Sequence, residues 1–205
     1  MIRFVVFLFF VLITFTNTTA QEIQEISEAE AKSATSKIHF RANPNTSNYD
    51  VTYHKLEFTV DPSVASISGK VTTTFTAKED LTTVTFDLDD NMIVTKVSEN
   101  GNPLSYSQNA NDELVITLQN TLLNNNSTSV SIEYNGNPTS NGFGSFEVST
   151  HNGTPVLWTL SEPYGALGWW PCKQDLNDKI DVIDVYITAP QQYVSVSNGL
   201  EQSTT

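Results

Sequence analysis

The residues best suited to chemistry lie together in one stretch, residues 158–184. This stretch holds all three tryptophans, the only cysteine and a run of acidic residues, in a chain that is otherwise rich in Ser, Thr, Asn and β-branched residues. Within it, Glu162 is followed by Pro163, then by small residues and bulky aromatic ones. Because a proline restricts the residue before it to extended backbone, the pattern predicts a carboxylate held at a strand end beside an apolar wall. Such a site could receive a small cation, for example a free amine.

Seven residues of this stretch keep a fixed spacing: Thr159, Glu162, Pro163, Ala166, Trp170, Pro171 and Cys172. Together they resemble, without a gap, the pattern T-x-x-E-P-x-x-A-x-x-x-[FW]-P-C-x-D. This pattern is found at the end of the N-terminal domain of M1 zinc aminopeptidases, the aminopeptidase N family. Two positions depart from it. Leu167 stands where the family commonly has an arginine, and the acid after the cysteine is displaced to Asp175, with Gln174 in its usual place. The sequence Trp169-Trp170-Pro171-Cys172 resembles the form of this pattern in the bacterial branch of the family.

The resemblance extends more weakly over residues 49–199 and implies a function. It implies the N-terminal, substrate-gating β domain of a secreted zinc aminopeptidase, which removes N-terminal amino acids from peptides. In that family the acid at position 162 helps to bind the α-amino group of the substrate, so Glu162 is the candidate substrate-binding residue in the intact parent. The alternative is a purely structural role, in which Glu162 only ends a strand at a loop.

The zinc site of that family, H-E-x-x-H with a more distant glutamate, is missing from this chain. None of His39, His54 and His151 is followed by Glu, and none has a second His at helical spacing. The family's G-x-M-E-N substrate motif is also missing. We therefore expect no catalytic residue, no metal ligand and no cofactor in this chain, with zinc held by the intact parent. By itself the chain is predicted not to hydrolyse peptides, and the three histidines are expected at surface or strand positions.

The aromatic residues and the cysteine have structural alternatives. Trp158, Trp169 and Trp170 could form a glycan-stacking platform, but adjacent strand residues point to opposite faces, so packing in the core or at a domain interface is favoured. Cys172 is interpreted as a small buried hydrophobic residue.

Acids recur every three residues in the same stretch, at Asp175, Asp178, Asp181 and Asp184. They lack the glycine and the terminal glutamate of an EF-hand calcium loop. We interpret them as a solvated acidic loop that runs into a strand.

The first 20 residues predict export. One basic residue, Arg3, precedes an apolar run and a small-residue ending, Thr18-Thr19-Ala20, as in a secretory signal peptide (residues 1–20). Once this segment is cleaved, no membrane span is expected, and the protein is expected in the periplasm, at the cell surface or outside the cell. Without Arg3, nine basic residues stand against 23 acidic ones, a net charge of about −14. That charge makes nucleic acids poor partners.

The mature chain is predicted to be all-β. Residues 21–48 form a polar lead-in with too few apolar residues for a core. Residues 49–205 show period-two alternation, broken by turn residues such as Asn100 and Gly101, a strong hairpin signal. The pattern predicts a mainly antiparallel β-sandwich or an open, saddle-like sheet, with its last strands at residues 180–188 and 193–197.

Two hypotheses remain for the whole chain. The first is the aminopeptidase N-like N-terminal domain, incomplete at its C-terminus and lacking its catalytic domain, with peptide N-termini as ligands of the intact parent. The second is a free-standing exported β-sandwich that binds glycans or another protein.

Overall fold

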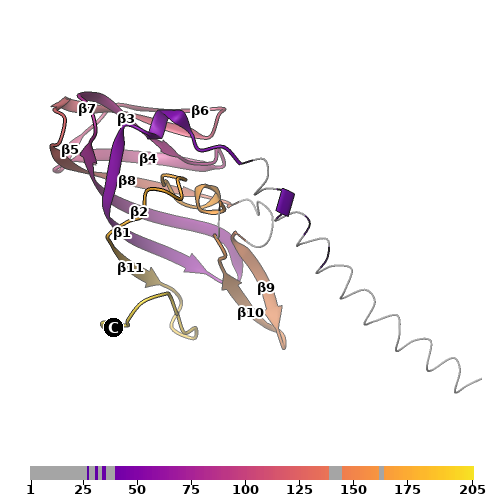
Figure 1. Ribbon diagram of the computed structural model, residues 1–205. Coiled ribbons are helices and arrows are strands. Elements are labelled where there is room, and N and C mark those ends of the chain that lie inside the picture. Colours follow the sequence, from indigo (N-terminus) through magenta and orange to yellow (C-terminus); the bar gives the residue numbers. More distant parts are fainter. Residues whose placement is uncertain (1–26, 28–30, 32–33, 36–39, 139–144, 162–163) are drawn as a thin grey trace, which may run out of the picture. The chain divides into compact units, whose positions relative to one another are not determined.

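The computed structural model describes residues 27, 31, 34–35, 40–138, 145–161 and 164–205. The chain divides into two units, Met1–Phe40 and Arg41–Thr205, and the second unit carries every strand of the described residues (Figure 1). In the first unit, the described residues 27, 31, 34 and 35 are helical. A helix with the length and apolar character of a membrane span is not found in the described part of the chain.

The described residues of the second unit form eleven strands and two short 3-10 helices. In chain order they are η1 (Pro44–Thr46), β1 (Tyr49–Asp61), β2 (Val64–Ala77), β3 (Leu81–Asp87), β4 (Met92–Glu99), β5 (Asn102–Pro103), β6 (Tyr106–Asn109), β7 (Glu113–Leu122), β8 (Ser127–Gly136), β9 (Glu147–His151), β10 (Thr154–Trp158), η2 (Ala166–Gly168) and β11 (Val182–Thr188). The predicted all-β fold is confirmed.

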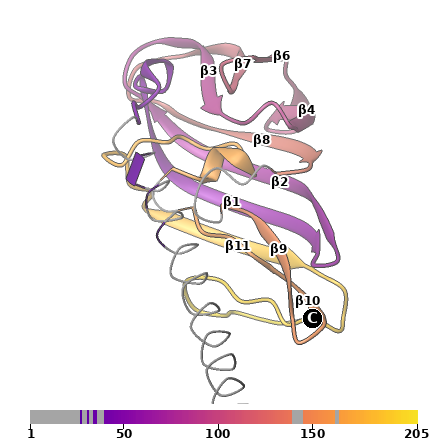
Figure 2. The ribbon, with the colours of Figure 1, turned by 90° about the vertical axis from the view of Figure 1, so that its right-hand side faces the viewer.

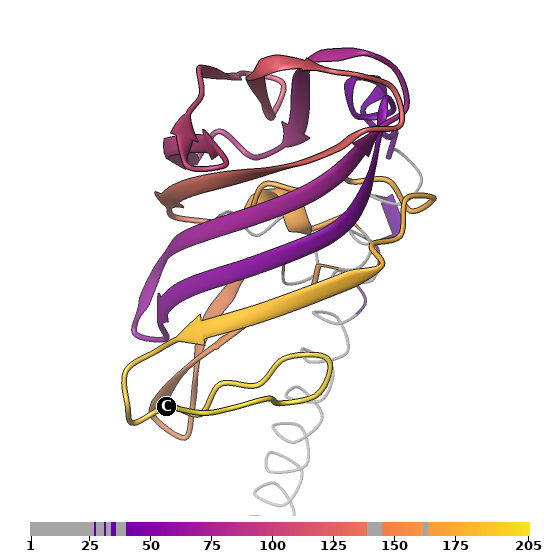
Figure 3. The same ribbon diagram turned by 90° about the vertical axis from the view of Figure 1, so that its left-hand side faces the viewer.

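The strands form three sheets. The largest has six strands in the order β11-β1-β2-β8-β4-β5, and its broad surface is seen in Figure 3. A three-stranded sheet, β3-β7-β6, lies at one end, and β9 and β10 form a separate hairpin. All pairings are antiparallel except β1 with β11, which is parallel. The sheet is therefore mainly antiparallel, as predicted, with one parallel edge.

Alternation along the strands decides which face is buried. On β2, Val71, Thr73 and Phe75 are fully buried, whereas the residues between them face outward. The outward threonines pair with serines of β8 through hydroxyl contacts of 2.7–2.8 Å: Thr72 with Ser131, Thr74 with Ser129 and Thr76 with Ser127. One face of the large sheet is thus polar, and the other forms the core.

The core joins the large sheet to the three-stranded one. The ring of Tyr49 lies 5.2 Å from Phe75 and 5.8 Å from Phe86, so strands β1, β2 and β3 meet there. The Tyr49 hydroxyl donates to the carbonyl of Thr85 at 2.7 Å. This buried contact fixes the end of β3. The end of β3 in turn holds Cys172 of the functional stretch, residues 158–184.

Two asparagine–glycine turns close hairpins. Asn100 and Gly101 have φ of 50° and 84°, the left-handed pair that a tight two-residue turn requires, which confirms the predicted hairpin. Asn152 and Gly153 repeat this geometry, with φ of 51° and 80°, between β9 and β10. The sequence analysis did not propose that second hairpin.

One strand prediction was wrong. Residues 193–197 are not a strand, and Val194 and Val196 are 91% and 86% exposed. Their alternation is strand-like, but a strand needs a partner, and β11 is the last paired strand of the described chain.

The end of the polar lead-in is anchored to the β domain. The Asn43 side-chain amide donates to Asp87 and Glu113, at 2.9 Å each, and the Asn45 amide donates to Glu113 at 2.7 Å. These bonds fix η1 against the ends of β3 and β7.

Candidate functional site

The stretch predicted to carry the chemistry lies against the inner side of the large sheet (Figure 2). The central candidate, Glu162, and Pro163 lie outside the described residues. Their neighbours Ser161 and Tyr164 are described, and so is all of the stretch that follows them. The position of the stretch is therefore defined by the contacts of the residues on either side.

Ser161 is held by two hydrogen bonds from downstream residues. The Trp169 indole Nε1 donates to the Ser161 hydroxyl at 2.9 Å, and the Gly165 backbone N donates to the Ser161 carbonyl at 2.9 Å. Gly165 is needed for close approach, because a Cβ there would lie 2.6 Å from the Cβ of Ser145. The result is a closed loop whose two described ends are fixed.

Trp169 connects this loop to the core. Its ring lies 5.1 Å from Phe58 and 6.1 Å from Phe146, and its carbonyl accepts from the Tyr134 hydroxyl at 2.8 Å. Tyr134 fits because its neighbour on β2 is Gly69, where a Cβ would lie 2.5 Å from the tyrosine ring. Burial raises the pKa of Tyr134 well above its usual value, so its hydroxyl stays protonated and donates.

The far end of the stretch pairs with β3. The backbones of Asp87 and Cys172 exchange two hydrogen bonds, at 2.8 and 3.0 Å, and the Asp87 carboxylate accepts from the Gln174 backbone N at 2.9 Å. Burial raises the pKa of Asp87 in spite of these bonds. Asp87 therefore anchors both the lead-in, through Asn43, and the end of the stretch.

Leu167 and Gln174, the two residues that depart from the family pattern, contact each other. The backbone N of Leu167 donates to the side-chain oxygen of Gln174 at 3.4 Å, and the Leu167 carbonyl accepts from the Asp89 backbone N at 3.0 Å. The glutamine thus bonds within the stretch.

One acid was assigned wrongly. Asp178, predicted to belong to a solvated loop, forms an ion pair with Lys173 in which both side chains are almost fully buried, 4% and 3% exposed. The Lys173 ammonium also donates to the Tyr49 carbonyl at 2.7 Å and lies 4.7 Å from the Tyr49 ring centroid. The threefold spacing of the acids gave no sign of this, because the pair is buried against the start of β1, where Lys173 contacts Tyr49 and Asp178 accepts from the Val51 backbone N.

The other acids of the run are closer to the prediction. Asp175 accepts from the Asn177 backbone N at 2.9 Å, and Asp181 is exposed. Asp184, on β11, accepts from the Tyr53 hydroxyl at 2.8 Å. These residues shape the loop and the sheet edge.

The tryptophans and the cysteine mainly pack. Trp170 is buried, Trp169 is half-buried against the core, and their rings meet at 6.2 Å in an edge-to-face arrangement. Only Trp158 is largely exposed, at 43%, so no flat three-ring platform forms. Cys172 is buried, and burial raises the pKa of its thiol, which confirms it as a small hydrophobic residue.

The described histidines do not fit a zinc site. His54 is buried on β1, where its Nδ1 lies 2.9 Å from the Thr73 hydroxyl, and burial lowers its pKa to about 4. His151 is exposed at the end of β9, and His39 lies outside the described residues. Among the described residues, the group of side chains that could hold a metal ion contains neither His54 nor His151. The expectation that this chain holds no zinc stays a prediction.

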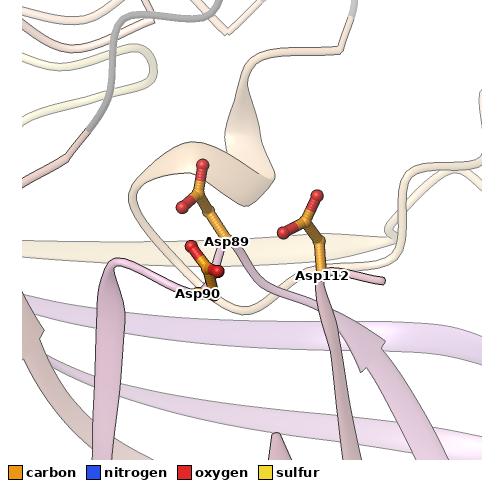
Figure 4. Close-up of side chains that lie close together, drawn as sticks. All are labelled: Asp89, Asp90 and Asp112. Carbon is orange, nitrogen blue, oxygen red and sulfur yellow. The ribbon is translucent and has the colours of Figure 1, made fainter. Parts of the chain in front are cut away.

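Three carboxylates do converge elsewhere, at Asp89, Asp90 and Asp112 (Figure 4). Their oxygens lie within 4.8 Å of one another. Burial and then the charge of Asp89 raise the pKa of Asp112. An all-carboxylate group suits hard cations better than zinc. The sequence analysis did not predict this group, because Asp112 is distant in sequence from Asp89 and Asp90 and comes close to them only through the turn before β7.

The β domain is similar to solved metallopeptidases. A mutant of a two-domain M1 zinc metallopeptidase bound to L-arginine is 27% identical, with a TM-score of 0.68, over 77% of this chain and 36% of that one. An M1 zinc metallopeptidase from Deinococcus radiodurans is 25% identical, with a TM-score of 0.69, over 78% and 36%. A mutant from the same organism, bound to a Tyr-Ser-Ala substrate, is 27% identical, with a TM-score of 0.64, over 78% and 37%.

The chain thus spans about a third of the length of these structures. No curated protein matches it. A family model described as the peptidase M1 N-terminal domain matches residues 45–205, which is most of the sequence and includes every strand seen in the described residues. The chain therefore belongs to the peptidase M1 N-terminal domain family.

Proposed function

We propose that this chain is the N-terminal domain of an exported, zinc-dependent aminopeptidase, which removes single amino acids from the free N-termini of peptides. In that enzyme the domain covers the active-site cleft, limits access to peptide N-termini and supplies Glu162 to bind the α-amino group of the substrate. The observation that carries the proposal is the glutamate-bearing motif, residues 159–172, within a domain of the M1 family.

The surroundings of Glu162 support this role. Ser161 on one side and Gly165 on the other are joined by a hydrogen bond of 2.9 Å, and Trp169 ties Ser161 to the aromatic core. A binding group contributes most when it is held in place before the ligand arrives, because less ordering accompanies binding. The described residues on either side of Glu162, Ser161 and Gly165, are fixed in this way.

A carboxylate at this point selects for a charged amine. A free N-terminus presents an ammonium that makes a charge-assisted hydrogen bond to a carboxylate, while an acylated N-terminus has no such charge. One such bond contributes about 1.5–3 kcal/mol. Zinc supplies a polarised water in such peptidases. Because the described histidines of this chain do not form its ligand set, we assign the metal to a separate catalytic domain.

Export follows from the predicted signal peptide, residues 1–20. This domain has one cysteine and cannot form a disulfide within itself, so its core must hold it together. The buried aromatic contacts of Tyr49, Phe75 and Phe86 supply such a core.

The test uses the full-length peptidase, recovered from the exported fraction of its host. We expect its N-terminus at Gln21 by mass spectrometry, about one zinc per chain, and chelator-sensitive release of amino acids from amino-acid amides. The same amides with acetylated N-termini should react far more slowly. A secreted protein without zinc that releases no amino acid would contradict the proposal and favour a free-standing β-sandwich that binds glycans or proteins.

A further inference from the structure

We propose that the outward face of the large sheet carries a binding groove for a neutral oligosaccharide. The groove has a volume of about 860 Å³, within the range of about 300–1,000 Å³ that is usual for ligand sites. It lies where β1 and β11 end and β2 begins, on the face turned to the viewer in Figure 3. None of the three tryptophans lines it, and the inference does not depend on the proposed peptidase function.

One row of outward side chains crosses five strands along the groove. The backbone register places these residues side by side, and all of them line the groove: Thr188 of β11, Thr59 of β1, Ser68 of β2, Asn135 of β8 and Ile93 of β4. Because neighbouring strands lie about 4.8 Å apart, the row extends over about 19 Å. Every member of the row except Ile93 is polar and uncharged, so the row offers hydroxyl and amide groups at regular intervals.

The polar side chains of this row keep their hydrogen-bonding capacity. Elsewhere on the same face the outward hydroxyls of β2 pair with serines of β8, as Thr74 does with Ser129 at 2.7 Å. Ser68 and Asn135 also stand directly opposite each other, but neither side chain forms a hydrogen bond to another described residue. The same holds for Thr59. Hydroxyl and amide side chains both donate and accept, as each hydroxyl of a sugar does.

Charge is scarce in the groove, which favours a neutral ligand. Among the described residues that line it, Asp61 is the charged one, and its carboxylate accepts from the hydroxyl and the backbone N of Ser63, at 2.7 and 2.8 Å. The next outward row differs, because Lys96 and Glu133 form an ion pair there. The net charge of −13 over the full sequence disfavours an anionic ligand, and a cation would meet one carboxylate that is already engaged.

Apolar surface beside the polar row suits the carbon faces of sugar rings. Val64 and Ile93 line the groove and are 49% and 60% exposed. A sugar ring that packs on them buries apolar surface, while its hydroxyls reach the polar row. A peptide fits less well, because peptides that bind sheets commonly add a strand to an open edge, and this row crosses the face of the sheet. The proposed export brings the groove into contact with the polysaccharides outside the cell membrane.

The experiment is calorimetric titration of the full-length protein with three neutral oligosaccharides, cellohexaose, maltohexaose and chitohexaose. At least one is expected to bind, and the acidic polysaccharide polygalacturonate is expected not to bind. Thr59→Ala and Asn135→Ala should each raise the Kd of the bound sugar about fivefold, the effect of one neutral hydrogen bond. Both residues are exposed, so Tm should not change. Thr74→Ala, on the same face but outside the groove, is the matched control and should leave Kd unchanged.

Aminopeptidase assays separate this inference from the proposed function. The kcat/KM for amino-acid amides is expected to be the same in all three variants, because Trp169 and the functional stretch pack against Phe58 on the other face of the sheet. A protein that binds the sugars but releases no amino acid would defeat the proposed function alone. The inference is overturned if none of the three sugars binds, if polygalacturonate binds as tightly as they do, or if Thr59→Ala and Asn135→Ala leave Kd unchanged.

Discussion

His54 illustrates how burial changes a residue type that elsewhere binds metals or transfers protons. It is 1% exposed, its Nδ1 lies 2.9 Å from the Thr73 hydroxyl, and the edge of its ring meets Trp170 at 5.1 Å. Burial disfavours the charged imidazolium and lowers the pKa of His54 to about 4. At neutral pH this histidine is therefore an uncharged packing residue beside the functional stretch.

This shift predicts that the protein loses stability in mild acid. Well above pH 6.5, His54 is neutral in both the folded and the unfolded chain, so the full stability is present. As the pH falls from 6.5 to 4, the unfolded chain binds a proton that the folded chain excludes, and unfolding becomes easier. The loss reaches about 3 kcal/mol at 1.36 kcal/mol per pKa unit. Urea titrations across this range should show a flatter profile for His54→Gln.

The control for this prediction is His151→Gln, which removes an exposed histidine. It is expected to leave the acid-induced loss in place. Identical profiles for the unmodified protein and His54→Gln would contradict the burial argument.

At the scale of elements, a buried ion pair joins the functional stretch to the first strand. Lys173 follows Cys172, and its ammonium contacts both Asp178 and the carbonyl of Tyr49 at the start of β1. Asp178 also lies 3.4 Å from the backbone N of Val51. The pair thereby fixes the loop before β11 against the sheet edge.

Breaking this pair should be costly. Asp178→Asn leaves the Lys173 charge buried and unpaired, and we expect a loss of about 3–5 kcal/mol in the free energy of unfolding. The double variant Lys173→Met/Asp178→Leu removes both charges and should lose less than either single variant. Urea denaturation measures both effects.

Lys55→Met is the matched control, because it breaks the Lys55–Glu57 pair, whose side chains are each 34% exposed. It should cost less than about 1 kcal/mol. Equal losses for Lys55→Met and Asp178→Asn would show that burial of the Lys173 pair has no energetic effect.

Local patterns predicted elements better than they predicted pairings. The alternation of Leu56 and Phe58 on β1 and the turn at Asn100 and Gly101 follow from neighbouring residues, and both were predicted. The parallel pairing of Tyr53 with Val182 joins residues far apart in sequence, and no local sequence pattern indicates it. For the same reason Asp178 was assigned to solvent: its burial depends on β1.

At the scale of the whole molecule, the fixed spacing of residues 159–172 carried the family prediction, because a rare set of residue types in one order is hard to match by chance. The match to the M1 N-terminal domain over residues 45–205 confirms it. The contacts that hold the motif, from Tyr134 and Asp87, could not be predicted, since they depend on strands packed from elsewhere in the chain. Function beyond the family stays a proposal, because the chain spans about a third of its solved relatives.

The most direct test of the account is kcat/KM of the full-length peptidase for amino-acid amides, before and after Glu162→Gln. Loss of one charge-assisted bond to the substrate ammonium predicts a decrease of about 10- to 100-fold, mainly through KM, with zinc content unchanged. Glu162→Asp keeps the charge on a shorter side chain, and its kcat/KM should lie between those of the unmodified peptidase and Glu162→Gln. Unchanged kcat/KM in Glu162→Gln would contradict the claim that this domain supplies the amine-binding group.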